Sequence, residues 1–152
     1  MPSTILNTDL RTLARRYAAD PNLWPMAPRF SPTERWYARI ATAEDHEAWL
    51  LTWLPGQRTD LHDHGGSAGA FQVVQGTLTE FTPAPGTLAG RTLGTGEIRG
   101  FGRRHIHQIV NTGMDPAISV HVYAPALIQM TRYDLRDGRL VTRAVERAGA
   151  DW

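Results

Sequence analysis

Turn-forming residues divide the chain from Arg35 onward into short segments rich in β-branched and aromatic side chains. Gly and Pro together account for 24 of the 152 residues (14 Gly and 10 Pro), a surplus that favours many short elements over a few long helices. Short strands must pair with one another to satisfy their backbone groups. The sequence therefore predicts an all-β domain, a sandwich or a small barrel.

Eight segments are predicted as strands by their composition and their flanking turn residues. They are residues 35–41, 47–54, 71–75, 77–81, 104–111, 117–123, 130–135 and 139–145. Asp137-Gly138 is a strong hairpin signal between the last two, and residues 83–86 are expected to form a loop.

The N-terminal part has a different pattern, which predicts an amphipathic helix over residues 8–19. Its apolar side chains follow the spacing i, i+3, i+4 and i+7: Leu10, Leu13, Ala14 and Tyr17. Pro21 and Pro25 prevent its continuation, so residues 22–32 are expected to form an irregular arm. A chain of this length suits one domain, with a helix and arm over 1–34 and a barrel over 35–145.

Charge and cysteine content exclude several classes of protein. The 16 basic residues, all Arg, are balanced by 15 acidic ones, so we expect no nucleic-acid partner. No run of 18 apolar residues and no secretory leader are visible, so we expect a cytoplasmic protein with no membrane contact. The chain has no Cys, which excludes disulfides, thiolate metal sites and a cysteine nucleophile.

The candidate functional residues begin with His62 and His64. Residues i and i+2 of a strand face the same side, so both imidazoles can converge on one metal ion while Asp63 points away. A third histidine, His107 or His105, could complete the site, because both have the same parity along a predicted strand.

The frame around these histidines resembles the paired motifs of the cupin superfamily, whose fold is a double-stranded β-helix barrel similar to a jelly roll. Gly56, His62, His64 and Gly76 resemble the first motif, and Gly96, His107 and Asn111 resemble the second. The Asn111 match favours His107 over His105. Cupins usually carry a Glu ligand at the position of Gly69, so this site would offer three neutral nitrogens and no carboxylate.

Within the cupins, three blocks resemble the cysteine dioxygenase family. They are residues 61–67, residues 107–111, and the alternating triad of Ser119, His121 and Tyr123 followed by Pro125. The animal members carry a Cys that crosslinks to the triad Tyr. That position is Gly69 here, so the chain resembles a bacterial-type member without the crosslink.

A fourth match concerns the substrate. Tyr37-Ala38-Arg39 resembles the early strand in which the family's Arg holds the substrate carboxylate, with a Tyr two residues before it. A guanidinium fork matches a carboxylate bidentately. Arg39 and Tyr37 are therefore expected to bind substrate, with Arg35 as the alternative to Arg39.

The resemblance implies a thiol dioxygenase that uses O2 to oxidise a small thiol, with L-cysteine favoured, to its sulfinic acid. His62, His64 and His107 would hold Fe(II), and Ser119 and His121 would orient the Tyr123 hydroxyl near the reacting groups. The alternatives are another thiol such as 3-mercaptopropionate, a zinc or manganese cupin isomerase or hydrolase, and a non-catalytic metal cupin that binds a small ligand. Beyond the thiol and O2, we expect a monomer or a weak homo-oligomer.

Overall fold

The computed structural model describes residues 4–152 of the chain. One helix and a 3₁₀ turn precede a series of short strands: α1 (Thr4–Ala19), η1 (Pro21–Leu23), β1 (Tyr37–Thr42), β2 (Glu47–Trp53), β3 (Leu61–His62), β4 (Ala68–Gln75), β5 (Leu78–Ala84), β6 (Thr87–Leu93), β7 (Ile98–Phe101), β8 (Gln108–Val110), β9 (Ala117–Ala124), β10 (Gln129–Arg136) and β11 (Arg139–Arg147).

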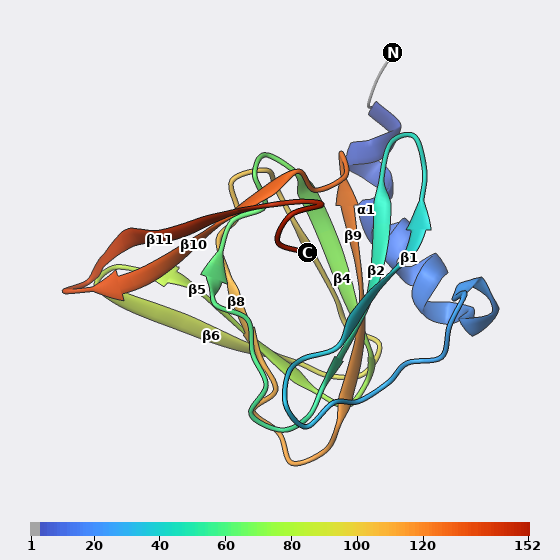
Figure 1. Ribbon diagram of the computed structural model, residues 1–152, viewed down its shortest axis with the longest axis horizontal. Helices are drawn as coiled ribbons and strands as arrows, with labels where there is room; N and C mark the ends of the chain where they lie inside the picture. Colours follow the sequence, from blue (N-terminus) through green and yellow to red (C-terminus); the bar gives the residue numbers. More distant parts are fainter. Residues whose placement is uncertain (1–3) are drawn as a thin grey trace.

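The strands form two walls that face each other (Figure 1). One wall is a five-stranded antiparallel sheet in the order β1-β2-β9-β4-β7. The other consists of two three-stranded sheets, β11-β10-β3 and β6-β5-β8. Bridges from Arg58 to Val110 and from His62 to His107 join these two sheets. The predicted all-β barrel with a short N-terminal helical segment is confirmed.

Strand β9 shows how the layers are arranged, because all eight of its residues are buried. The alternate residues Ile118, Val120 and Val122 belong to an outer core with Leu10 and Ala14 of α1, which covers the five-stranded sheet from outside (Figure 1). The opposite face of the sheet lines the barrel interior. Because neither face of β9 contacts water, polar side chains on it must find partners inside the protein. The polar residues on its inner face, Ser119 and His121, therefore require a separate explanation.

The second hydrophobic core fills one part of the interior between the walls. Its buried members are Leu51, Trp53, Phe71, Val73, Leu78, Leu93, Ile109 and Ala117. These apolar side chains pack that part of the barrel interior. Polar and aromatic side chains occupy the rest of it.

Several predicted boundaries were wrong. The helix begins at Thr4 rather than residue 8, and the predicted strand 104–111 contracts to β8. Residues 83 and 84 belong to β5, so the expected loop over 83–86 narrows to a turn. Strands β3, β6 and β7 were not predicted. The predicted final hairpin is present as β10 and β11, with positive φ at Asp137 and Gly138.

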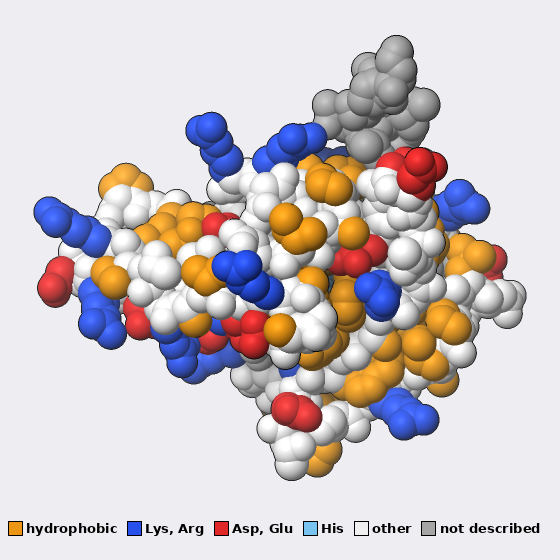
Figure 2. Space-filling view, turned by 45° about the horizontal axis from the view of Figure 1, so that its top comes forward, with side chains coloured by type: hydrophobic (Ala, Val, Ile, Leu, Met, Phe, Trp, Pro, Cys, Tyr) orange, Lys and Arg blue, Asp and Glu red, His pale blue; other side chains and the backbone are white. Residues whose placement is uncertain are grey.

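Arginine and acidic side chains are interspersed on the face shown in Figure 2 rather than gathered into a field of one sign. Among residues 4–152, no helix has the length and apolar character needed to cross a membrane.

Candidate metal centre and adjoining pocket

His62, His64 and His107 form a compact group at the junction of the two smaller sheets. The backbone N–H of His62 donates to the carbonyl of His107 at 3.0 Å, and His107 returns the bond at 3.1 Å. This reciprocal bridge places the two side chains opposite each other. The three ring centroids lie 4.8–4.9 Å apart, and the planes of the rings cross at 66–81°. One nitrogen from each ring lies within 4.8 Å of the others, a spacing that suits a shared metal ion.

The hydrogen bonds of these rings indicate which nitrogens are free. His62 donates from Nδ1 to the Asp60 carbonyl at 2.7 Å, which leaves Nε2 as its free acceptor. His107 Nε2, and both nitrogens of His64, are buried without a hydrogen-bond partner among the described residues. Unpartnered buried nitrogens are costly unless a ligand satisfies them. The donor set therefore fits a metal ion held by three imidazoles.

Burial also sets the charge of the donors. It lowers the pKa of all three rings, for His62 and His64 well below the usual histidine value. Metal ligation requires the neutral imidazole, so the site is electrostatically prepared for a cation.

Asp63 and Gly65 hold the loop that carries the first two histidines. Asp63 Oδ1 accepts from the backbone N–H of Thr131 at 2.9 Å, and its Oδ2 accepts from the Tyr133 hydroxyl at 2.9 Å. Gly65 has φ +59°, and a Cβ there would lie 2.3 Å from the carbonyl oxygen of Gln129. The loop is thus fastened to β10, with His62 and His64 directed inward.

Glu80 is a functional residue that the sequence reasoning missed. Its side chain is 2% exposed, and Oε2 accepts from His107 Nδ1 at 2.8 Å and from His105 Nε2 at 2.9 Å. Arg99 Nε donates to Oε1 at 2.8 Å. Burial alone raises the pKa of Glu80, but these hydrogen bonds outweigh it and hold the pKa well below its usual range. Glu80 thereby fixes the tautomer and orientation of His107.

His105 does not belong to the three-histidine group. It bonds to Glu80 and stacks on the ring of Phe101, with centroids 4.8 Å apart. The structure thus brings His107, the favoured third histidine, to His62 and His64, and it places His105 behind His107.

The triad residues lie on the inner face of β9. Trp53 Nε1 donates to Ser119 Oγ at 2.9 Å, and Ser119 Oγ lies 2.8 Å from His121 Nε2. Since the Ser119 hydroxyl has no other acceptor among the described residues, it donates to Nε2 and leaves the proton of His121 on Nδ1. That Nδ1 is buried without a partner, and no hydrogen bond to Tyr123 occurs within the described range. Burial lowers the pKa of His121 and raises that of Tyr123, so both side chains stay neutral.

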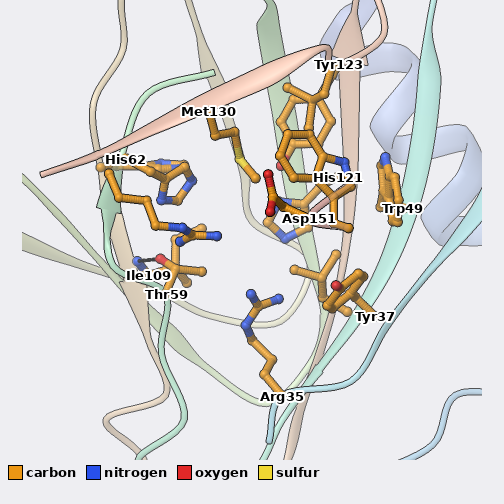
Figure 3. Close-up of a pocket in the computed structure, with 15 residues that line it drawn as sticks. Arg35, Tyr37, Trp49, Thr59, His62, Ile109, His121, Tyr123, Met130 and Asp151 are labelled. Atoms are coloured by element: carbon orange, nitrogen blue, oxygen red, sulfur yellow. Dashed lines mark hydrogen bonds between the residues drawn. The ribbon is translucent and has the colours of Figure 1, made fainter. Parts of the chain in front are cut away.

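His62 and His107 of the three-histidine group line a cavity of about 100 Å³. Figure 3 shows the side chains that surround it, which come from both walls and from the C-terminal residues Asp151 and Trp152. Leu51, Ile109, Leu127 and Met130 supply apolar surface next to His62, His107, His121 and Tyr123. The cavity therefore offers a small, largely apolar chamber beside the metal-binding nitrogens.

Arg35, rather than Arg39, points into this cavity (Figure 3). The guanidinium carbon of Arg35 lies 5.5 Å from the ring centroid of Tyr37 and 5.1 Å from that of Trp53, and its buried Nε has no partner among the described residues. Tyr37 lines the cavity as expected.

Arg39 shares a face of the sheet with Tyr37 but lies at its edge. Its side chain is 55% exposed, with Nη1 at 3.8 Å from Glu47 Oε1 and the guanidinium over the Trp49 ring. Arg39 is therefore not among the residues that line the cavity, and its expected role in binding substrate stays a prediction.

Comparison with known proteins identifies the family. The family model described as cysteine dioxygenase type I matches residues 4–136. The chain belongs to the cysteine dioxygenase family. It is 24% identical over 145 residues to cysteine dioxygenase type 1 of Homo sapiens and to that of Pongo abelii, matches that cover 86% of this chain and 70% of each relative.

Solved structures agree on the fold. A protein from Thermus thermophilus has a TM-score of 0.59 at 22% identity, covering 65% of this chain and 90% of its own. An RmlC-like cupin protein from Desulfovibrio desulfuricans also reaches 0.59, at 16% identity, with 68% of this chain and 93% of its own covered. The barrel is a cupin double-stranded β-helix, as predicted.

Membership in the cysteine dioxygenase family makes the chain a thiol dioxygenase with a metal-binding group of three histidines. Gly69, where the animal members are expected to carry the crosslinking Cys, lies opposite Tyr123 across β4 and β9. A Cβ at Gly69 would lie 2.5 Å from Phe101 Cζ and 2.9 Å from the Val122 carbonyl oxygen. Tyr123 is consequently a free phenol beside a tightly packed glycine.

Proposed function

We propose that the protein oxidises a small carboxylate-bearing thiol to its sulfinic acid at an Fe(II) ion held by His62, His64 and His107. L-cysteine is the favoured substrate and 3-mercaptopropionate the alternative. The observation that carries the proposal is that two members of this three-histidine group, His62 and His107, line a small cavity that is also lined by the unpartnered cation of Arg35.

The donor set supports iron of the non-haem type. Three neutral imidazoles on one face leave positions free on the opposite side, as the facial sites of non-haem Fe(II) oxygenases do. When bound, Fe(II) would supply the centre at which the thiolate and O2 meet. The reaction is R–SH + O2 → R–SO2H, in which both oxygen atoms end on sulfur and no external reductant is needed.

Arg35 supports a carboxylate-bearing substrate. The guanidinium of Arg35 loses part of its hydration beside this apolar cavity, which costs free energy. Its contacts with the rings of Tyr37 and Trp53 recover less of that free energy than an anionic partner would. A carboxylate on Arg35 would fix one end of the substrate and leave its thiol directed at the histidines. In this proposal Arg35 takes the role that the sequence predicts for Arg39. Comparing variants of the two arginines tests which of them binds the carboxylate.

Tyr123 and His121 would act on the substrate as neutral hydrogen-bond donors. The raised pKa of Tyr123 keeps its hydroxyl protonated, so it can donate to an oxygen or carboxylate in the cavity. Ser119 holds His121 in the tautomer that presents Nδ1–H. These donors are in place before substrate binds, so little reorganisation accompanies the reaction.

Oxygen uptake tests the proposal. Protein loaded with Fe(II) under anaerobic conditions is mixed with L-cysteine or 3-mercaptopropionate, and the product is weighed by mass spectrometry. We expect uptake of one O2 per thiol and a product heavier by two oxygen atoms. Protein that holds one iron and binds both thiols without turnover would contradict the proposal and favour a ligand-binding cupin.

Arg35→Gln and Arg39→Gln form a matched pair in the same assay. We expect Arg35→Gln to raise the KM for both thiols, while Arg39→Gln leaves it close to that of the unmodified protein. The reverse result would return the carboxylate site to Arg39.

A further inference from the structure

A second depression adjoins the metal pocket and is strongly basic. It has a volume of about 420 Å³, and four guanidiniums line it, those of Arg35, Arg58, Arg132 and Arg143. Its only acidic lining residues among those described are Asp60 and Glu146, so the excess charge is +2 (four minus two). Apart from Arg35, the residues that line this depression have no role in the chemistry proposed above.

The ion pairs within the depression do not neutralise it. Arg132 contacts Glu146, and it shares Asp60 Oδ2 with Arg143, at 3.8 Å and 3.3 Å respectively. Within residues 4–152, neither Arg35 nor Arg58 has a carboxylate within ion-pair distance. Two guanidiniums thus have no direct carboxylate partner. Burial and the charge of Arg132 lower the pKa of Arg35, and the more distant Asp60 opposes this shift.

The depression and the metal pocket are neighbours. Arg35, Thr59 and Arg132 line both. Arg132 is the direct partner of His62 in the pairing of β10 with β3, so its side chain leaves the sheet beside a metal-binding residue and on the same side. A molecule with its sulfur at the histidines can therefore place one anionic group at Arg35 and a second one at Arg132.

We infer that the preferred substrate is a thiol with two anionic groups, the second of which binds in the basic depression at Arg132 and Arg58. The inference rests on the proposed thiol oxidation and narrows its substrate class. An anion between these guanidiniums relieves their mutual repulsion, which a substrate with one carboxylate at Arg35 leaves in place.

Mercaptosuccinate and 3-mercaptopropionate are the probes, because they differ by a single carboxylate. In the oxygen-uptake assay we expect the KM for mercaptosuccinate to be lower by roughly 10- to 100-fold, the range of a charge-assisted hydrogen bond. Arg132→Gln should bring the ratio of the two KM values close to one. Because Arg132 also lines the metal pocket, this ratio rather than either KM alone is compared. Arg136→Gln is the matched control. Arg136 lies on the same strand, but its side chain is 70% exposed and lines neither cavity, so both KM values should stay unchanged.

Two further measurements test the second anionic site without bound iron and with a variant that is expected to fold normally. Succinate should bind the metal-free protein more tightly than propionate, and added salt should narrow the difference. Arg58 is exposed, so Arg58→Gln is expected to fold normally and to weaken only the binding of the dicarboxylates.

The outcomes separate the two proposals. Oxidation of 3-mercaptopropionate and mercaptosuccinate with equal KM, or equal binding of succinate and propionate, overturns the second anionic site and leaves thiol oxidation standing. Absence of oxidation for every thiol, together with selective succinate binding, overturns the proposed oxidation and retains the anionic site.

Discussion

Glu80→Gln should weaken metal binding without changing the shape of the site. The exchange retains one oxygen acceptor but replaces the other with an NH2 group. If the amide oxygen faces His107 and His105, the NH2 group opposes Arg99 Nε, which now donates to Glu80 Oε1 at 2.8 Å. His107 then keeps a hydrogen bond to a neutral acceptor and loses the charge that makes it a better ligand.

Loss of such a carboxylate partner typically costs 10- to 100-fold in metal affinity, or about 1.4–2.7 kcal/mol. Competition between the protein and a chromophoric chelator for Co(II) or Fe(II) measures this affinity directly. Glu97→Gln is the matched control, because Glu97 also accepts a hydrogen bond, from the Gly94 N–H, but is exposed and bonds to none of the metal-binding histidines. The melting temperature of each metal-free variant shows whether the fold is intact. An affinity for Glu80→Gln equal to that of the unmodified protein would refute the role assigned to Glu80.

Three other perturbations follow from the same geometry. His107→Ala should abolish retention of iron after dialysis while His105→Ala keeps most of it, and loss of iron in the His105 variant alone would reverse the ligand assignment. Ser119→Ala frees Nε2 of His121 and leaves Trp53 Nε1 without its acceptor, so kcat should fall and the metal-free protein should melt earlier by the equivalent of about 1–3 kcal/mol; an unchanged kcat would remove Ser119 from the positioning of His121. The metal-free protein should also lose stability as the pH falls below about 6.5, because its buried histidines have lowered pKa values and the unfolded chain takes up protons first; equal melting temperatures at pH 7.5 and 5.5 would contradict this.

Much of the fold could be predicted because alternation and turn residues are local signals. β9 and the β10–β11 hairpin illustrate this, since each has β-rich segments beside clear turns. β6 reads TLAGRTL and is mostly exposed, so it shows neither alternation nor a strong strand propensity. β3 is only two residues long, and its place in the barrel depends on partners far away in the chain.

The site could be predicted only in part, for a similar reason. His62 and His64 converge as their spacing indicates, although only His62 lies within a strand. Arg35 lies before the start of β1. Its direction into the pocket therefore depends on the course of the loop and could not be predicted from the alternation of side chains along a strand. The signal for Glu80 was present: it lies two residues after buried Leu78 in a predicted strand, and a carboxylate at a core position requires partners.

The packing around Gly69 limits the order in which this enzyme could acquire a crosslink like that of its animal relatives. A Gly69→Cys change alone drives Cβ into Phe101 and the Val122 carbonyl, an overpacking that typically costs about 1–3 kcal/mol. Shrinking Phe101 first removes the ring that stacks on His64 at 4.6 Å and on His105. A side chain at position 69 therefore requires that Phe101 and the backbone at Val122 shift with it, and a shift of Phe101 in turn disturbs the packing against His64 and His105.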